Sequence, residues 1–160
     1  MTEVKAPRGT PNAAEAGATA AGAGTYKLEE QVGHLIRRVH QRASAIFQSV
    51  IGDEQITPTQ YAALVKLYDL GELSQNHLGR LTAMDPATTQ GVIRRLQDRA
   101  LIAARNDETD RRRTLLSLSP AGVELIVRLM RNGPAVTDTT LEPLTMAERD
   151  TFLALLKRLC

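Results

Sequence analysis

Apolar residues recur every three or four positions over two long stretches of the chain, near its start and near its end. Over residues 26–50 this spacing predicts an amphipathic helix of about six turns. A second helical pattern begins at Ser119 and is interrupted at Gly133, beside a proline. A third follows Thr145, which can form a capping box with Glu148. The pattern predicts a mainly helical chain.

Two short helices joined by a tight turn are predicted between these stretches. Ser74 is a good capping residue for a helix that runs to about Leu81 and buries Leu78 and Leu81. Asp85, followed by a proline, predicts the start of the next helix. At 100° per residue, one side of that helix collects the residues that we expect to be buried, which are Thr89, Val92, Ile93, Leu96 and Ala100.

The opposite face of this second helix combines small residues with hydrogen-bonding ones: Ala87, Gln90, Gly91 and Arg94. A helix face that meets only water usually has longer charged residues, so this face is suited to close approach to the edges of bases. A glycine in mid-helix costs roughly 1 kcal/mol relative to alanine. Gly91 therefore either clears space for DNA or permits tight packing against another helix.

A β-hairpin is predicted next, from two short extended runs at residues 101–106 and 113–118 with a turn-rich segment between them. Three consecutive arginines, residues 111–113, follow the turn and repel one another. Phosphates and the narrow minor groove of DNA are anionic sites that would hold such a cluster. A solvated charged loop is the alternative. Asp107 and Asp110 are expected to pair with part of the cluster.

The net charge is only +2 over 160 residues, but it is unevenly distributed. Eight arginines and five acidic residues lie between Arg80 and Arg113, a local excess of three positive charges that can steer the chain toward DNA. No arrangement of nucleophile and base, phosphate-binding glycine loop or cofactor motif is evident. We therefore expect no catalytic residues and no cofactor.

The remaining chemistry-bearing residues predict neither a metal site nor a disulfide. His34, His40 and His77 have no metal-ligand spacing, and Cys160 is the single cysteine, which favours a reducing cytoplasm. No apolar run is long enough for a membrane span. Residues 1–25 are rich in Ala, Gly, Thr and Pro, which predicts a disordered tail without the apolar segment of a signal peptide.

The order of these motifs resembles the MarR family of bacterial winged-helix transcription regulators from about residue 28 to the C-terminus. The most specific part is the D-x-x-D-R-R-R loop followed by LSLSPAG. The segments TPTQYAALVKL and SQNHLGRLTAMD are similar to regulators of nicotinate degradation, within a branch that represses aromatic-acid catabolism. The expected fold is mainly α with a small β-hairpin wing: a winged helix-turn-helix at 56–118, with a helical dimerisation region at 26–55 and 119–160.

The terminal helices contain more apolar surface than one chain can easily cover, which predicts a two-fold homodimer. Two recognition helices related by a dyad would enter successive major grooves of double-stranded DNA, on an inverted-repeat operator. We expect the start of the first short helix to contact phosphates, the second helix to contact base edges, and Arg112 to enter the minor groove. The predicted DNA-binding residues are Ser74, Gln75, Asn76, Thr88, Gln90, Arg94, Arg95, Asp110, Arg111, Arg112 and Arg113.

The family resemblance also implies a small aromatic acid, such as a hydroxynicotinate, as an effector bound between the dimerisation helices and the winged module. A cation and histidines beside aromatic rings suit a flat carboxylate, and the candidates are His34, Arg38, His40, Tyr61 and Tyr68. Each could instead be ordinary helix surface. A ligand-independent architectural DNA-binding protein, a redox-sensing regulator and a protein–protein adaptor are the alternative functions.

Overall fold

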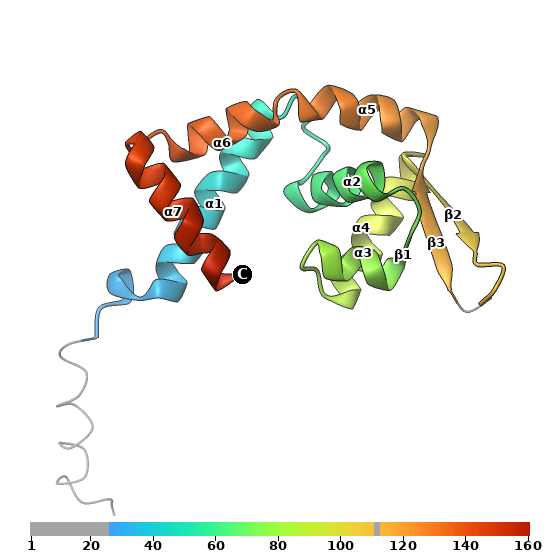
Figure 1. Cartoon of the computed structure of the whole chain (residues 1–160), viewed down its shortest axis with the longest axis horizontal. Helices are drawn as coiled ribbons and strands as arrows, with labels where there is room; N and C mark the ends of the chain where they lie inside the picture. Colours follow the sequence, from blue (N-terminus) through green and yellow to red (C-terminus); the bar gives the residue numbers. More distant parts are fainter. Residues whose placement is uncertain (1–25, 111–112) are drawn as a thin grey trace, which may run out of the picture. The chain divides into compact units, whose positions relative to one another are not determined.

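The computed structural model describes residues 26–110 and 113–160. Tertiary contacts divide the chain into two units, one ending at Val39 and one running from His40 to Cys160. The chain is mostly helical, with a small antiparallel sheet in the second unit (Figure 1). The predicted fold class is confirmed. The predicted tail, residues 1–25, and two of the three wing arginines, Arg111 and Arg112, lie outside the described residues.

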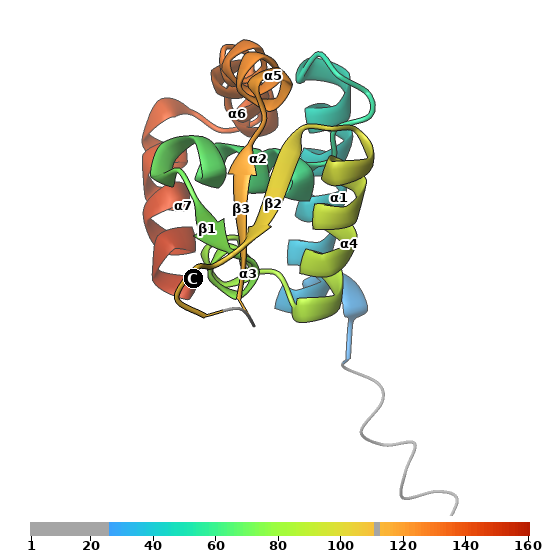
Figure 2. The ribbon, with the colours of Figure 1, turned by 90° about the vertical axis from the view of Figure 1, so that its right-hand side faces the viewer.

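The helices are α1 (Val32–Val50), α2 (Pro58–Leu70), α3 (Gln75–Leu81), α4 (Pro86–Asp98), α5 (Pro120–Met130), α6 (Gly133–Leu141) and α7 (Met146–Leu159). The strands are β1 (Leu73–Ser74), β2 (Ile102–Asn106) and β3 (Thr114–Leu118). They form one antiparallel sheet in the order β1-β3-β2 (Figure 2). The sequence did not predict β1, because two residues cannot display an alternating pattern.

The helices α3, α4, α5 and α7 begin where capping residues predicted them to begin. Ser74, Asp85, Ser119 and Thr145 each accept a hydrogen bond from the backbone N–H three residues further on. The predicted capping box between Thr145 and Glu148 is present, and α2 has one as well. The first long helix is shorter than predicted. It starts at Val32, because Gln31 is extended and separates it from a short 3-10 helix at Leu28–Glu30.

The winged module is built around one core that α2, α3, α4, α5 and the sheet share. Its fully buried side chains include Leu64, Leu78, Leu96, Leu116 and Ile126. Four of the five residues that the helical wheel predicted to be buried are the buried residues of α4: Thr89, Val92, Ile93 and Leu96.

Two core predictions were wrong. Leu81, at the end of α3, is 36% exposed. Ala100 is exposed because α4 ends at Asp98, and Ala100 takes a left-handed backbone conformation with φ of 54°. Both residues fit the helical period but lie where the helix stops, so that their side chains leave the buried stripe.

Candidate nucleic-acid interface

The outer face of α4 presents the predicted base-reading residues to solvent. Ala87, Gln90 and Arg94 are exposed, and Thr88 is exposed with its hydroxyl donating to Asp85 at 2.5 Å. That bond and the Thr88 N–H hold the pKa of Asp85 below its usual range. The capping carboxylate therefore stays charged beside the N-terminus of α4.

Gly91 lies on this same face and packs against no other helix. Among the described residues, a Cβ at Gly91 would approach within 4 Å only the guanidinium of Arg95, at 3.7 Å. Tight helix packing therefore does not explain the glycine. Its effect is to lower the outer surface of α4 between Gln90 and Arg94.

A polar groove of about 630 Å³ joins the start of α3 to the wing. Its lining combines residues predicted to contact phosphate with residues of the wing: Ser74, Gln75, Asn76, Arg80, Asp110, Arg113 and Thr114. In both ribbon views the loop of the β2–β3 hairpin lies at the same end of this unit as α3 (Figures 1 and 2). The fold thus brings the start of α3 and the hairpin, which are far apart in the sequence, together at one groove.

Arg80 belongs to this surface and was missed in the sequence. It is exposed and lines both the polar groove and a second depression of about 380 Å³ between α3 and α4. The signal for it was its position four residues after Asn76, which places both side chains on one helix face.

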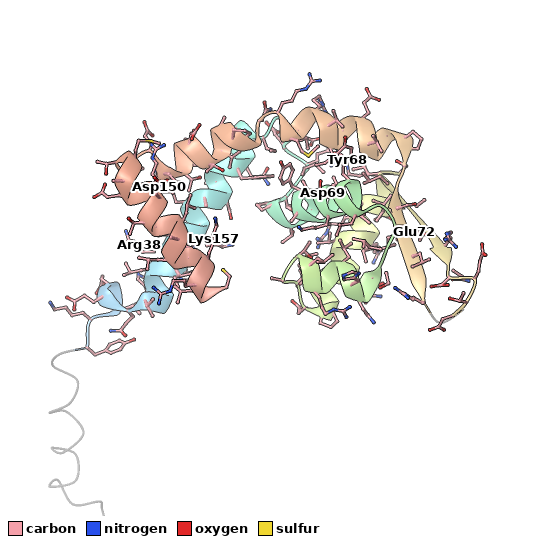
Figure 3. All side chains as sticks on the ribbon, in the orientation of Figure 1. Arg38, Tyr68, Asp69, Glu72, Asp150 and Lys157 are labelled. Carbon is pink, nitrogen blue, oxygen red and sulfur yellow. The ribbon has the colours of Figure 1, made fainter. Side chains whose placement is uncertain are left out.

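The wing is fixed to the rest of the module by an arginine fork. Arg105 on β2 donates from Nε and Nη2 to the two carboxylate oxygens of Glu72, at 2.8 and 2.6 Å. Glu72 precedes β1 and is labelled next to the strands in Figure 3. Two parallel charge-assisted bonds fix the orientation of the Arg105 guanidinium relative to the carboxylate. The bond to Glu72 also raises the pKa of Arg105.

The hairpin loop is closed by hydrogen bonds around Arg113. The N–H of Asp107 donates to Arg113 O at 2.9 Å, and the N–H of Arg113 donates to Asp110 O at 2.8 Å. The Arg113 guanidinium lies 3.8 Å from the Asp107 carboxylate, which confirms the predicted pairing of Asp107 with an arginine. Hydrogen bonds from the Thr109 backbone and hydroxyl lower the pKa of Asp107. Arg113 remains half exposed toward the groove.

A second candidate site is a pocket of about 370 Å³ within the His40–Cys160 unit. It is lined by Phe47, Ile51, Pro58, Tyr61, Gly133, Val136 and Thr137. The rings of Phe47 and Tyr61 meet edge to face, with centroids 5.4 Å apart. Burial raises the pKa of Tyr61, so its hydroxyl stays protonated and can donate a hydrogen bond. A Cβ at Gly133 would lie 3.1 Å from that hydroxyl.

Five residues were predicted for an effector site, and one of them, Tyr61, lines this pocket. Tyr68, near the end of α2, is 44% exposed (Figure 3), and His40 is exposed on α1. His34 and Arg38 belong to the N-terminal unit. A role for these four in ligand binding stays a prediction.

Similarity to known proteins identifies the type of module. The MarR family model matches residues 54–113. The chain is 36% identical over 134 residues to the HTH-type transcriptional repressor NicR of Pseudomonas putida, covering 84% of this chain and 85% of NicR. The chain belongs to the MarR family. It is thus a DNA-binding transcriptional regulator, and the relatives that it matches are regulators rather than enzymes.

Two solved MarR-type structures are similar over most of the chain. One is a probable transcriptional regulator from Pseudomonas aeruginosa, 44% identical with a TM-score of 0.79, covering 84% of this chain and 100% of that one. The other is Bordetella bronchiseptica BpsR, whose DNA binding is regulated by 6-hydroxynicotinic acid. BpsR is 41% identical with a TM-score of 0.75, covering 81% of this chain and 98% of its own.

Two further features are absent from the residues that the structure describes. None of their helices is long and apolar enough to cross a membrane. Within the same residues, no group of three His, Cys, Asp or Glu side chains could hold a metal ion.

Proposed function

We propose that this MarR family protein is a repressor that binds an inverted-repeat operator as a homodimer and is released by a small aromatic acid. The observation that supports DNA binding most directly is the exposed face of α4 together with the polar groove, which shares Arg80 with the depression between α3 and α4. In this proposal Thr88, Gln90 and Arg94 meet base edges in the major groove. Residues of the polar groove and Arg95 meet phosphates.

The two halves of this surface are suited to different parts of the duplex. The face of α4 is low at Gly91, which allows the helix to sit deep in a groove. The polar groove offers the Ser74 hydroxyl, the side-chain amides of Gln75 and Asn76, and the guanidinium groups of Arg80 and Arg113. These are donors that bind phosphate oxygens, and Arg111 and Arg112 would add to them.

The apolar surface of α7 supports the homodimer. No side chain of α7 is buried, and Met146, Leu153, Leu155 and Leu159 are among its exposed apolar residues. A shallow apolar depression lined by Phe152 and Leu155 lies on the same helix. Large apolar side chains that are this exposed mark an interface, and a second copy of the chain covers them symmetrically.

The pocket around Tyr61 supports an aromatic-acid effector. Its volume and its mainly apolar lining are those of a small-molecule site, with hydroxyl groups of Tyr61 and Thr137 to orient a polar ligand. BpsR points to the nicotinate type, because its DNA binding is regulated by 6-hydroxynicotinic acid. Such a ligand acts by binding more tightly to an arrangement of the dimer that does not match the operator.

The DNA-binding proposal is tested by replacing one base-reading residue. We expect Arg94→Ala to weaken binding to the operator by about 1–3 kcal/mol and to relax preference at one base position. Fluorescence anisotropy with duplexes selected from a random library measures both effects. The matched control is Arg128→Ala, an exposed arginine on α5. Equal affinities for Arg94→Ala and wild type would remove α4 from the recognition surface.

The effector proposal is tested on the preformed protein–DNA complex. We expect 6-hydroxynicotinic acid to release the DNA, benzoate to do so less well, and Tyr61→Phe to raise the concentration needed. The phenylalanine keeps the ring contact with Phe47 and removes only the hydroxyl. If no aromatic acid releases the wild-type protein at millimolar concentration, the effector proposal fails and the DNA proposal stands.

A further inference from the structure

An ion pair joins the connection between α1 and α2 to the end of the recognition helix. Arg99, the residue that caps the C-terminus of α4, donates from Nη2 to Oδ2 of Asp53 at 3.1 Å. The pair is largely shielded, with side chains 27% and 14% exposed. Nη1 of Arg99 is buried without a hydrogen-bond partner among the described residues. Loss of Asp53 would therefore leave a poorly compensated cation in the protein interior.

Asp53 is itself held firmly in the connection between the helices. Its Oδ1 accepts the N–H of Gln55 at 2.8 Å, and its carbonyl accepts the N–H of Ile56 at 3.1 Å. The side chain of Asn132, between α5 and α6, donates to Ile51 O at 3.0 Å. Both Ile51 and Ile56 are fully buried. The polar groups and the apolar side chains of this segment are therefore both anchored.

The same connection borders the pocket around Tyr61. Ile51 and Pro58, at the two ends of the connection, both line that pocket. Asp53 lies between them in sequence, so a change in the shape of the pocket is transmitted to Asp53 through a few residues of backbone. The other residue of the pair, Arg99, directly follows the last residue of α4. This is the helix that presents Gln90 and Arg94.

We propose that the Asp53–Arg99 pair is a positioning contact that sets the orientation of α4, and that filling the Tyr61 pocket acts on α4 through it. The linkage rests on the proposed effector function. The orienting role does not, since it concerns the protein without ligand. In the DNA-binding arrangement the pair is formed, and the ligand favours an arrangement in which Asp53 is displaced from Arg99.

The variants Asp53→Asn, Arg99→Gln and the double variant test the pair. Asparagine keeps the size of the side chain and the oxygen that accepts the Gln55 N–H, while the charge and the acceptor that faces Arg99 are lost. Two affinities are measured for each variant, for operator DNA without ligand and with saturating 6-hydroxynicotinic acid. Direct ligand binding is measured by calorimetry. The control is Asp138→Asn, which removes the exposed carboxylate of another ion pair, with Arg149, 3.9 Å apart.

We expect each single variant to lose DNA affinity by at least about fivefold without ligand, and the double variant to lose no more than the singles. The ratio of the two affinities should fall toward one, while calorimetry shows that ligand binding is retained and is no weaker than in wild type. A merely structural contact would not change that ratio. Asp138→Asn should behave as wild type.

Three results separate the claims. Wild-type affinity in all three variants overturns the positioning role. Weakened DNA binding with an unchanged ratio overturns the linkage. If wild type is not released by any acid, the effector proposal and the linkage fail, and the positioning role is decided by the ligand-free affinities. Should Asp53→Asn or Arg99→Gln not fold, judged by circular dichroism, Arg99→Lys takes its place and should weaken binding and lower the ratio, because an ammonium cannot reproduce the guanidinium geometry.

Discussion

At the scale of single residues, the end of α4 has an amino acid that is unusual for its backbone conformation. Ala100 has a φ of 54° and donates its N–H to Gln97 O at 2.7 Å, while Leu101 donates to Leu96 O at 2.9 Å. This is the Schellman arrangement, in which glycine is the usual residue at the left-handed position. Alanine there retains the hydrogen bonds but keeps an unfavourable backbone conformation.

We expect Ala100→Gly to raise the free energy of unfolding by about 1 kcal/mol, since glycine adopts the left-handed conformation without steric cost. Urea unfolding followed by circular dichroism, at one fixed protein concentration, measures the change. The control Ala104→Gly, at an exposed position within β2, should lower stability, because glycine weakens a strand. A loss of stability in Ala100→Gly would contradict the assignment of strain to that residue.

The carboxylate of Asp85 predicts a dependence of stability on pH. Its pKa in the folded protein is lowered, first by the Thr88 hydroxyl and then by the Thr88 N–H. The resulting stabilisation is fully present above the ordinary value of 3.8 and is lost as the pH falls through the lowered folded value. In urea unfolding between pH 6 and about 2.5, Asp85→Asn should show a shallower decline than wild type, since asparagine caps a helix without titrating. Parallel profiles would count against the cap as the source.

Local residue signals in the sequence predicted most helix starts and few helix ends. Ser74 and Asp85 act on backbone groups three residues away, so the sequence contains the whole interaction. Leu81 and Ala100 failed because periodicity continues past the point where a helix stops. The fork between Glu72 and Arg105 joins residues 33 positions apart. Neither residue is distinctive until the sheet brings them together.

At the scale of elements, close backbone approach explains the glycine of the SPAG segment. A Cβ at Gly122 would lie 2.0 Å from Leu101 O, in the turn between α4 and β2. The same carbonyl accepts the N–H of Ser119 at 3.0 Å. The first turn of α5 is therefore packed directly on the backbone that follows the recognition helix, and a methyl group cannot be accommodated there without moving one of them.

We expect Gly122→Ala to lower the free energy of unfolding by about 3 kcal/mol, because backbone rather than a flexible side chain must shift. Gly91→Ala is the matched control. Its Cβ meets open space beside Arg95, so stability should rise by up to about 1 kcal/mol while operator affinity falls. Thermal unfolding and anisotropy on the same samples give both quantities. Similar stability in Gly122→Ala and wild type would mean that α5 can move away from this turn.

At the scale of the whole molecule, the proposed homodimer is supported by the surface of a single chain. The sequence indicated excess apolar surface at the ends of the chain, and α7 presents such a surface. Of the proposed effector pocket, the sequence pointed to Tyr61 alone. The pocket draws Phe47, Tyr61 and Gly133 from three helices, and Gly133 contributes by lacking a side chain that would crowd the Tyr61 hydroxyl.

We expect Leu155→Glu to raise the dimer dissociation constant at least about a hundredfold, since moving a carboxylate into an apolar interface costs several kcal/mol. Sedimentation equilibrium measures it. Leu70→Glu, at a similarly exposed leucine on α2, is the control and should remain dimeric. A dimer of undiminished stability in Leu155→Glu would place the interface elsewhere than on α7.

Ser74 makes two contacts that connect the β2–β3 hairpin to α3. It pairs with Leu115 as part of β1, and its hydroxyl starts α3 by accepting the His77 N–H. The hairpin is therefore anchored at its base. We expect the loop between Asn106 and Thr114 to tolerate changes in sequence and length without a shift of α3. In the proposed DNA complex, a change in this loop would alter contacts with the sugar–phosphate backbone and leave the base-reading face of α4 in place.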